Sequence, residues 1–135
     1  MKIIFLDIDG VLNNTHTKNP RKFPYIVEPE LIERLKRLLA ATGAQIVLSS
    51  TWRYDPVGRL AAKHYEIPFI DVTPVLPDQP RRDEIRQWIH DHPGVERFIL
   101  IDDEDDELDD LPLFQPSDEI GLTHEVRAIA GTCSR

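Results

Sequence analysis

The stretch IIFLDIDGVL, residues 3–12, runs four apolar residues into two aspartates, Asp7 and Asp9, and then into a glycine. A short apolar run that ends in an acid is typical of a buried parallel strand with a carboxylate at its C-terminal end. Ligands of open α/β sheets bind at that end, and Gly10 lets the chain turn sharply or approach a ligand closely. Because two carboxylates repel each other, the stretch predicts a positive partner there, most simply a metal ion.

The same pattern recurs at two further points of the chain. The apolar residues 46–48 lead into Ser49-Ser50-Thr51, and the apolar residues 98–101 lead into Asp102-Asp103. Neighbouring strands of one sheet lie about 4.8 Å apart, so the ends of parallel strands meet at one edge. The sequence therefore predicts a cluster of carboxylates and a serine hydroxyl, which suits Mg²⁺ and phosphate better than zinc.

Apolar periodicity predicts an alternation of strands and helices along the chain. Strands are expected at residues 2–7, 44–49, 68–73 and 97–101, with a weaker one at 113–115, and helices at 29–41, 57–65, 82–90 and 123–130. Residues 13–25 lack a period and predict an exposed flap beside the site. Such an alternation is typical of a parallel sheet with right-handed crossovers, here in one domain over residues 1–135.

Composition limits the classes of function. A chain of 135 residues can bury a core without disulfides, and its single cysteine, Cys133, is expected to be an incidental thiol. The net charge of −8 argues against a broad nucleic-acid footprint and against stable duplex binding, although a local basic pocket remains compatible with it. The start of the chain lacks a signal-peptide core and no apolar run reaches a membrane span, which predicts a cytoplasmic protein without membrane association.

Taken together, the strand ends resemble the haloacid dehalogenase (HAD) superfamily of aspartate-dependent phosphatases. FLDIDGVL, residues 5–12, matches its first motif, residues 47–50 match the second, and residues 100–103 match the fourth. The third motif is a lysine or arginine upstream of the last strand, for which Arg81 and Arg82 are the candidates. SSTWR at 49–53, RRDEI at 81–85 and GLT at 121–123 resemble a small bacterial subgroup, similar to the HAD domains of some RNA-repair proteins.

The resemblance implies a three-layer, Rossmann-like α/β fold with helices on both faces of the sheet. It also implies a Mg²⁺-dependent phosphomonoesterase, with Asp7 as the nucleophile that forms an aspartyl-phosphate and Asp9 as the general acid and base. The metal would be held by Asp7, by the backbone carbonyl of Asp9 and by Asp102. Asp103 would act as a ligand through water or as an orienting group.

Several assignments stay open at this level. Either Ser49 or Ser50 would donate to the phosphate, the other capping the following turn. Two cations at a helix N-terminus oppose the helix dipole, so either Arg81 or Arg82 is expected to bind an anion there, unless the acids that follow simply offset them. Trp52-Arg53 either packs and adds a surface charge or flanks the substrate. Residues 104–110 are expected to form a solvated acidic loop.

The alternatives to a Mg²⁺-dependent phosphomonoesterase are a catalytically silent binding module, a phosphotransferase and a protein phosphatase. The presence of Asp9 argues against the silent module. The segments between the motifs are too short for a cap domain, which argues against phosphotransfer because an open site admits water. An open site also favours terminal phosphates of nucleotides or oligonucleotides, with a rim charge from four basic residues: Lys18, Arg21, Lys22 and Arg53.

Overall fold

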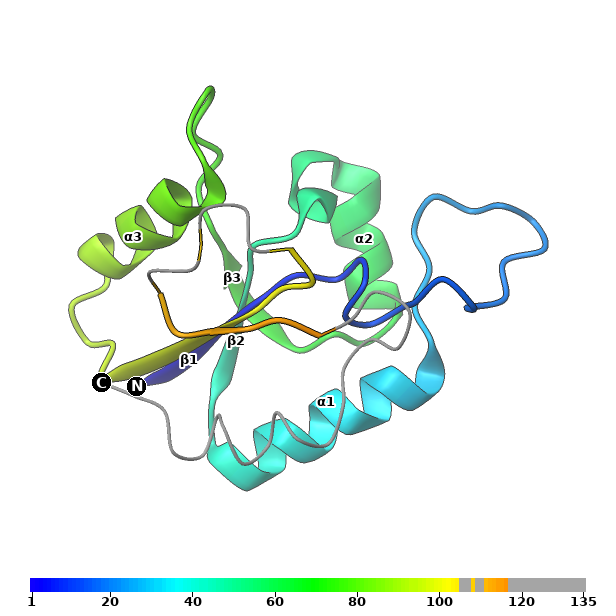
Figure 1. Ribbon diagram of the computed structural model, residues 1–135, viewed down its shortest axis with the longest axis horizontal. Helices are drawn as coiled ribbons and strands as arrows, with labels where there is room; N and C mark the ends of the chain where they lie inside the picture. Colours follow the sequence, from blue (N-terminus) through cyan, green and yellow to red (C-terminus); the bar gives the residue numbers. More distant parts are fainter. Residues whose placement is uncertain (105–107, 109–110, 117–135) are drawn as a thin grey trace.

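The computed structural model describes residues 1–104, 108 and 111–116 (Figure 1). Within these residues the elements are β1 (Lys2–Leu6), α1 (Pro29–Thr42), β2 (Gln45–Leu48), the 3₁₀ helix η1 (Thr51–Tyr54), α2 (Pro56–His64), β3 (Phe69–Val72), α3 (Arg81–Asp91), β4 (Arg97–Ile101) and β5 (Leu113–Phe114). The strands form one sheet in the order β3-β2-β1-β4-β5, and every pair in it is parallel. The strand order doubles back at β1, as in a Rossmann-like fold.

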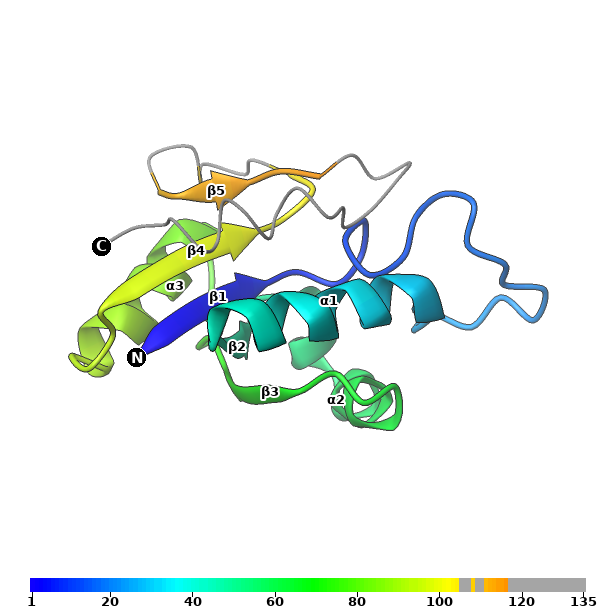
Figure 2. The same cartoon turned by 90° about the horizontal axis from the view of Figure 1, so that it is seen from below.

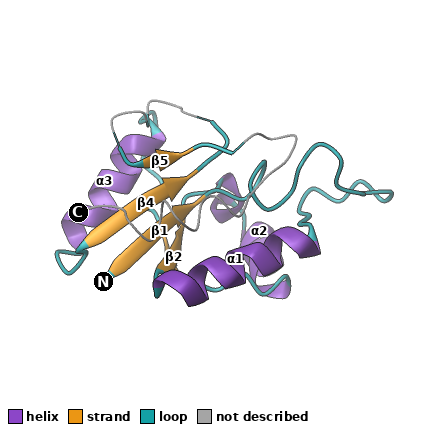
Figure 3. Ribbon diagram, turned by 60° about the horizontal axis from the view of Figure 1, so that its bottom comes forward, coloured by secondary structure: helices purple, strands orange, loops and turns teal. Residues whose placement is uncertain are grey.

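β1 lies at the centre of the sheet because its side chains are apolar on both faces. Phe5 is paired with Val47 of β2 on one side and with Leu100 of β4 on the other. Ile4 and Leu6 pack into the core shared with α1 and α2, whereas Ile3 and Phe5 pack into the core shared with α3. The result is three layers, with α1 in front of the sheet and α3 behind it in Figure 2, and the strands between them in Figure 3.

Helix α1 begins and ends where its sequence predicts. Pro29 occupies its first turn, where a missing N–H costs no hydrogen bond. Leu31, Leu35 and Leu38 lie on its buried face. Gly43 ends the helix with φ of 70°, a left-handed conformation that glycine adopts at least cost, and its N–H donates to the carbonyl of Leu39 at 2.9 Å.

The predicted alternation of elements is confirmed over the described residues, including the weak fifth strand. The short helix η1 was not predicted; it begins after Ser50, whose hydroxyl accepts the N–H of Trp52 at 3.1 Å. The predicted helix at 123–130, the GLT stretch at 121–123 and Cys133 lie outside the described residues. None of the described helices is both long and apolar enough to span a membrane.

The segment that joins β1 to α1 forms an extended loop without a helix or strand, as predicted for residues 13–25 (Figure 1). One end of this flap differs from the prediction of an exposed segment. Asn13 is buried, because its side chain hydrogen-bonds to three groups around the end of β1: the Gly10 N–H, a carboxylate oxygen of Asp9 and the carbonyl of Ile26.

Candidate active site

Three carboxylates meet where β1 and β4 end. Asp7 follows β1, and Asp102 and Asp103 follow β4; one oxygen from each lies within 4.8 Å of the others. The parallel register, which pairs Leu6 with Ile101, continues one residue further as the Asp7 N–H donates to the Ile101 carbonyl at 2.9 Å. Asp7 is only 6% exposed and Asp102 only 2%. The parallel pairing of β1 and β4 thus brings these carboxylates close together in a place that is largely shielded from water.

This crowding changes the proton affinity of the cluster. Burial raises the pKa of Asp7 well above its ordinary value of 3.8, the charge of Asp102 raises it further, and Arg81 opposes both effects. Burial also raises the pKa of the Asp103 carboxyl; its hydrogen bond with Asp7 lowers this pKa, and the charge of Asp102 raises it. The net repulsion means that a cation bound at this place would stabilise the ionised forms.

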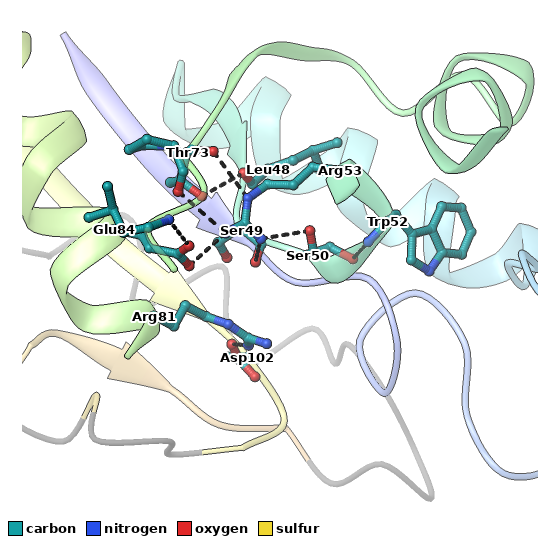
Figure 4. A network of polar contacts seen from close by, with 11 residues as sticks. Leu48, Ser49, Ser50, Trp52, Arg53, Thr73, Arg81, Glu84 and Asp102 are labelled. Atoms are coloured by element: carbon teal, nitrogen blue, oxygen red, sulfur yellow. Dashed lines mark hydrogen bonds and ion pairs between the residues drawn. The ribbon is translucent and has the colours of Figure 1, made fainter. Parts of the chain in front are cut away.

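Arg81 is the one of the two candidate arginines that the structure brings to the cluster. It is the first residue of α3, and its guanidinium forms an ion pair with the Oδ2 atom of Asp102 (Figure 4). Arg82 is placed differently, with its Nε atom 3.8 Å from the Oδ1 atom of its neighbour Asp83. Arg82 does not line the cavity described next.

A cavity of about 190 Å³ opens beside the cluster. It is lined by Asp7, Asp9, Thr51, Arg81, Asp103 and Glu104. Thr51 and Glu104 were not predicted as site residues. Thr51 follows Ser49 and Ser50 as the third hydroxyl-bearing residue after β2, and this run of hydroxyl residues could have marked Thr51 as a site residue. Glu104 was assigned to the solvated acidic loop, yet its N–H donates to an oxygen of Asp102 at 3.0 Å and the residue borders the cavity.

A second hollow, of about 240 Å³, adjoins the first and shares Asp9 and Asp103 with it. Gly10 borders this hollow with φ of 80°, a conformation that favours glycine. A Cβ atom at this position would collide with the carboxylate of Asp103. Gly10 therefore allows the close approach that the motif predicts, here between the loop after β1 and the loop after β4.

Asp9 lies at the edge of both hollows and is exposed. Its Oδ1 atom accepts the indole N–H of Trp52 at 3.1 Å and the amide N–H of Asn13 at 3.0 Å. The side chain of Asp9 is not part of the three-carboxylate group. This position is compatible with the role that the resemblance assigns, in which only the backbone carbonyl of Asp9 reaches the metal.

Ser49 and Ser50 are both buried and follow β2 directly (Figure 4). The Ser49 N–H donates to the Leu6 carbonyl at 3.0 Å, so the serines lie beside the end of β1, but neither lines the 190 Å³ cavity. The Ser50 hydroxyl accepts a hydrogen bond as the cap of η1. The backbone carbonyls of both serines accept from the Nη1 atom of Arg53 at 2.9 Å. Of the two hydroxyls, that of Ser50 is therefore the one occupied by a local turn.

Arg53 is buried, and its predicted place on a charged rim or beside the substrate is wrong. The residue is 1% exposed, and its guanidinium donates to the Thr73 carbonyl at 3.0 Å and to Glu84 at 2.6 Å (Figure 4). An arginine has five N–H donors, and here they join the ends of β2 and β3 to helix α3. Because all of these partners are protein groups inside the fold, the charge of Arg53 stabilises the structure.

Trp52 is likewise buried, at 1% exposure, and its ring packs edge-on against Tyr25 with the centroids 5.0 Å apart. The sequence offers two interpretations of Trp52, plain packing or a place beside the substrate. Neither includes the hydrogen bond that its indole N–H donates to Asp9. Local sequence carries no signal for that bond, since the two residues are 43 positions apart.

The residues present fit a small divalent cation. Carboxylate oxygens are the ligands that Mg²⁺ prefers, and Asp7, Asp102 and Asp103 bring three of them together in a place where burial, and then the charge of Asp102, raises the pKa of Asp7 and of Asp103. Asp102 also pairs with Arg81, which gives the site one fixed positive charge.

Residues 3–126 match the model of a family described as "HAD domain in Swiss Army Knife RNA repair proteins". The match spans all five strands and the ends that form the carboxylate cluster. No curated protein and no solved structure matches the chain. The strand topology, the acids at the ends of β1 and β4 and the length of the family match together show that the chain belongs to the HAD superfamily, in the family of HAD domains of Swiss Army Knife RNA repair proteins.

Proposed function

We propose that the protein is a Mg²⁺-dependent phosphomonoesterase with Asp7 as its nucleophile. The observation that carries this proposal is the buried Asp7 carboxylate, which is grouped with the carboxylates of Asp102 and Asp103 and lines a cavity together with Arg81. A carboxylate nucleophile divides hydrolysis into two easier steps. Three acids grouped with one arginine suit a reaction in which a dianionic phosphate and a cation bind at the same place.

The chain's own residues can perform both steps. An oxygen of Asp7 attacks phosphorus, the bond between phosphorus and the ester oxygen breaks, and protonated Asp9 gives its proton to the departing oxygen. Water then attacks the phosphorus of the aspartyl-phosphate, and Asp9 takes up the proton that this water loses. The bond between phosphorus and the Asp7 oxygen breaks, which releases phosphate and restores the Asp7 carboxylate. Arg81 and a serine hydroxyl are suited to bind the phosphate oxygens. Mg²⁺, held by Asp7, Asp102 and Asp103, would supply positive charge to the transferred phosphoryl group.

Mg²⁺ is expected to raise the thermal midpoint of the protein, and to raise it more at pH 8 than at pH 5. The pKa values of Asp7 and Asp103 are raised in the folded state above 3.8. As the pH rises from 3.8 through these raised values, the unfolded chain loses its protons first, so the metal-free folded protein loses stability. A bound cation offsets this loss, and a ligand at 100 times its Kd stabilises by about 2.7 kcal/mol.

Thermal unfolding with MgCl₂ or with EDTA at the two pH values measures this effect. Asp103→Asn serves as the matched variant, because it removes one charge and keeps the shape of the side chain. It should unfold at a higher temperature than the wild type in EDTA and respond less to Mg²⁺. A Mg²⁺ response of the same size at both pH values, or one unchanged in Asp103→Asn, would contradict the proposed metal site.

For the substrate we propose terminal phosphates of nucleotides or oligonucleotides. Within the described residues the cavity is bordered by the segments after β1 and β4 and by the first residues of η1 and α3, and by no additional domain, so a large molecule can present its end. A further hollow of about 320 Å³ lies in the flap region, lined among others by Lys18, Arg21, Phe23 and Tyr65. Phe23 is 53% exposed, and an exposed aromatic ring beside cations suits a stacked base and its phosphates.

The experiment that tests the function is a phosphatase screen of the purified protein, with MgCl₂ and with EDTA, over four groups of substrates. These are nucleotides, sugar phosphates, phosphopeptides and oligonucleotides with a 3′- or 5′-phosphate. The expected result is Mg²⁺-dependent release of phosphate, with the highest kcat/KM on a nucleotide or oligonucleotide. Binding without turnover would favour the silent module. A sugar phosphate or phosphopeptide with a far higher kcat/KM would refute the proposed substrate class.

A further inference from the structure

Two side chains from different parts of the sequence donate hydrogen bonds to one oxygen of Asp9. Trp52 donates its indole N–H to Oδ1 from η1, and Asn13 donates its amide N–H to the same atom from the start of the flap. The Oδ2 atom makes no hydrogen bond to any residue within the described part of the chain. The two oxygens of this exposed carboxylate therefore differ in hydrogen bonding: Oδ1 accepts two N–H groups, and Oδ2 accepts none from the described residues.

The donors are themselves held in place. The Oδ1 atom of Asn13 accepts the Gly10 N–H at 2.9 Å, and its Nδ2 atom also donates to the Ile26 carbonyl at 2.9 Å. The ring of Trp52 is fixed by Tyr25, whose hydroxyl donates to an oxygen of Asp55 at 3.0 Å. Because Asn13 and Trp52 are buried, rotation of either side chain would break hydrogen bonds or ring packing.

A carboxylate oxygen that accepts two N–H groups has both of its lone pairs in use. When Asp9 is a carboxylic acid, its proton therefore sits on Oδ2. Asp9 borders both hollows beside the carboxylate cluster, where an ester oxygen would leave. Proton transfer in a transition state requires this kind of fixed geometry, and a small misplacement costs rate.

We propose that Trp52 and Asn13 are positioning residues that orient Asp9 so that Oδ2 exchanges the proton with the ester oxygen. This inference rests on the proposed phosphatase function and goes beyond it, because it names the residues that set the acid and the oxygen that acts. Neither residue touches the phosphate in this assignment. Both act through Asp9.

The effect of a variant on two esters with different leaving groups distinguishes a loss of Asp9 positioning from a general loss of activity. An alkyl phosphate releases a poorly stabilised alkoxide and needs the proton, whereas 2,4-dinitrophenyl phosphate releases a stable phenolate without help. Trp52→Phe removes the indole N–H and keeps an aromatic ring for Tyr25. We expect it to lower kcat/KM by about 10-fold or more on the alkyl phosphate, as part of the 10²–10⁴ that an acid contributes, and to change the dinitrophenyl ester little. Asp9→Asn should show the same selectivity with a larger loss.

The chain offers a matched control in its other tryptophan. Trp88 is also buried and also donates its indole N–H to an aspartate, Asp71, at 2.8 Å, but it lies in the core behind the sheet. Trp88→Phe should leave the ratio of the two kcat/KM values unchanged. The two indole N–H resonances provide a second readout without turnover: Asp9→Asn should shift the resonance of Trp52 and leave that of Trp88 in place.

An equal loss on both esters in folded Trp52→Phe, or a Trp52 resonance that Asp9→Asn does not move, would overturn the inference while leaving the phosphatase function intact. A wild-type protein that hydrolyses neither ester would overturn the proposed function, and the inference with it. The two failures are thus distinguishable from the wild-type rates alone.

Discussion

Asp7→Asn is expected to abolish phosphate-ester hydrolysis and, in EDTA at pH 7, to raise the thermal midpoint of the protein. An amide cannot attack phosphorus, and removal of a nucleophile costs roughly 10³-fold or more in rate. The stability gain has a separate cause: burial and the charge of Asp102 raise the pKa of Asp7, so the ionised side chain opposes folding. Asparagine has the same shape and removes that charge.

The measurement pairs a steady-state assay with thermal unfolding of the same sample. Asp91→Asn is a suitable control, because Asp91 is exposed at the end of α3 and, among the described residues, accepts hydrogen bonds from Gln87 alone. It should change neither activity nor midpoint appreciably. An Asp7→Asn protein that is folded and keeps a tenth of the wild-type activity would remove Asp7 as the nucleophile. A lower midpoint in EDTA would show that the buried carboxylate stabilises the fold.

Arg53→Met is expected to lower the free energy of unfolding by about 3–5 kcal/mol, the usual cost of leaving one partner of a buried ion pair alone. The side chain of Arg53 is fully buried and that of Glu84 is 4% exposed, with 2.6 Å between Nη2 and Oε1. Without Arg53, Glu84 keeps the Leu76 N–H at 2.9 Å as its hydrogen bond. Four backbone carbonyls that follow β2 and β3 lose a donor: those of Ser49, Ser50, Thr73 and Pro74. Such a loss is a large part of the stability of a domain of this size.

Urea unfolding of this variant can be compared with that of Arg34→Met, which makes the same substitution in a pair with an exposed acid. Arg34 bonds Glu30 at 2.9 Å along helix α1; the side chain of Arg34 is 20% exposed and that of Glu30 is 71% exposed. Pairs of this kind stabilise by about 0.3–0.5 kcal/mol. The double variant Arg53→Met/Glu84→Met should recover part of the loss, since no buried charge is left alone. Equal losses in the two arginine variants would contradict the structural role of Arg53.

This pair also bears on the site. Glu84 lies one helical turn after Arg81 on α3 (Figure 4). The ion pair between Arg53 and Glu84 therefore fixes the N-terminal end of α3, which carries Arg81. The chain thus uses one arginine to hold the helix and another to face the carboxylates. Arg53 lies in η1 and Arg81 begins α3, and their charges are the same. What differs is the set of partners that the fold places around each.

The strand ends could be predicted from sequence because their signal is local. An apolar run followed at once by Asp7, by Ser49 or by Asp102 places an oxygen at the end of a buried strand, whatever the rest of the chain does. The alternation of helices and strands then requires a parallel sheet, and parallel strands bring these ends together. The carboxylate cluster is therefore a consequence of short patterns and one topological rule.

The partners of Asn13, Trp52 and Arg53 were decided only by the tertiary structure. Asn13 stands in a polar loop and Arg53 in a polar turn, and composition alone predicts that both are exposed; folding buries them because distant groups satisfy their hydrogen bonds. Trp52 meets Asp9 across 43 residues, and Arg53 meets Glu84 across 31. A polar side chain is buried only where its donors find acceptors, and the positions of those acceptors are set by the packing of strands and helices that no local pattern contains.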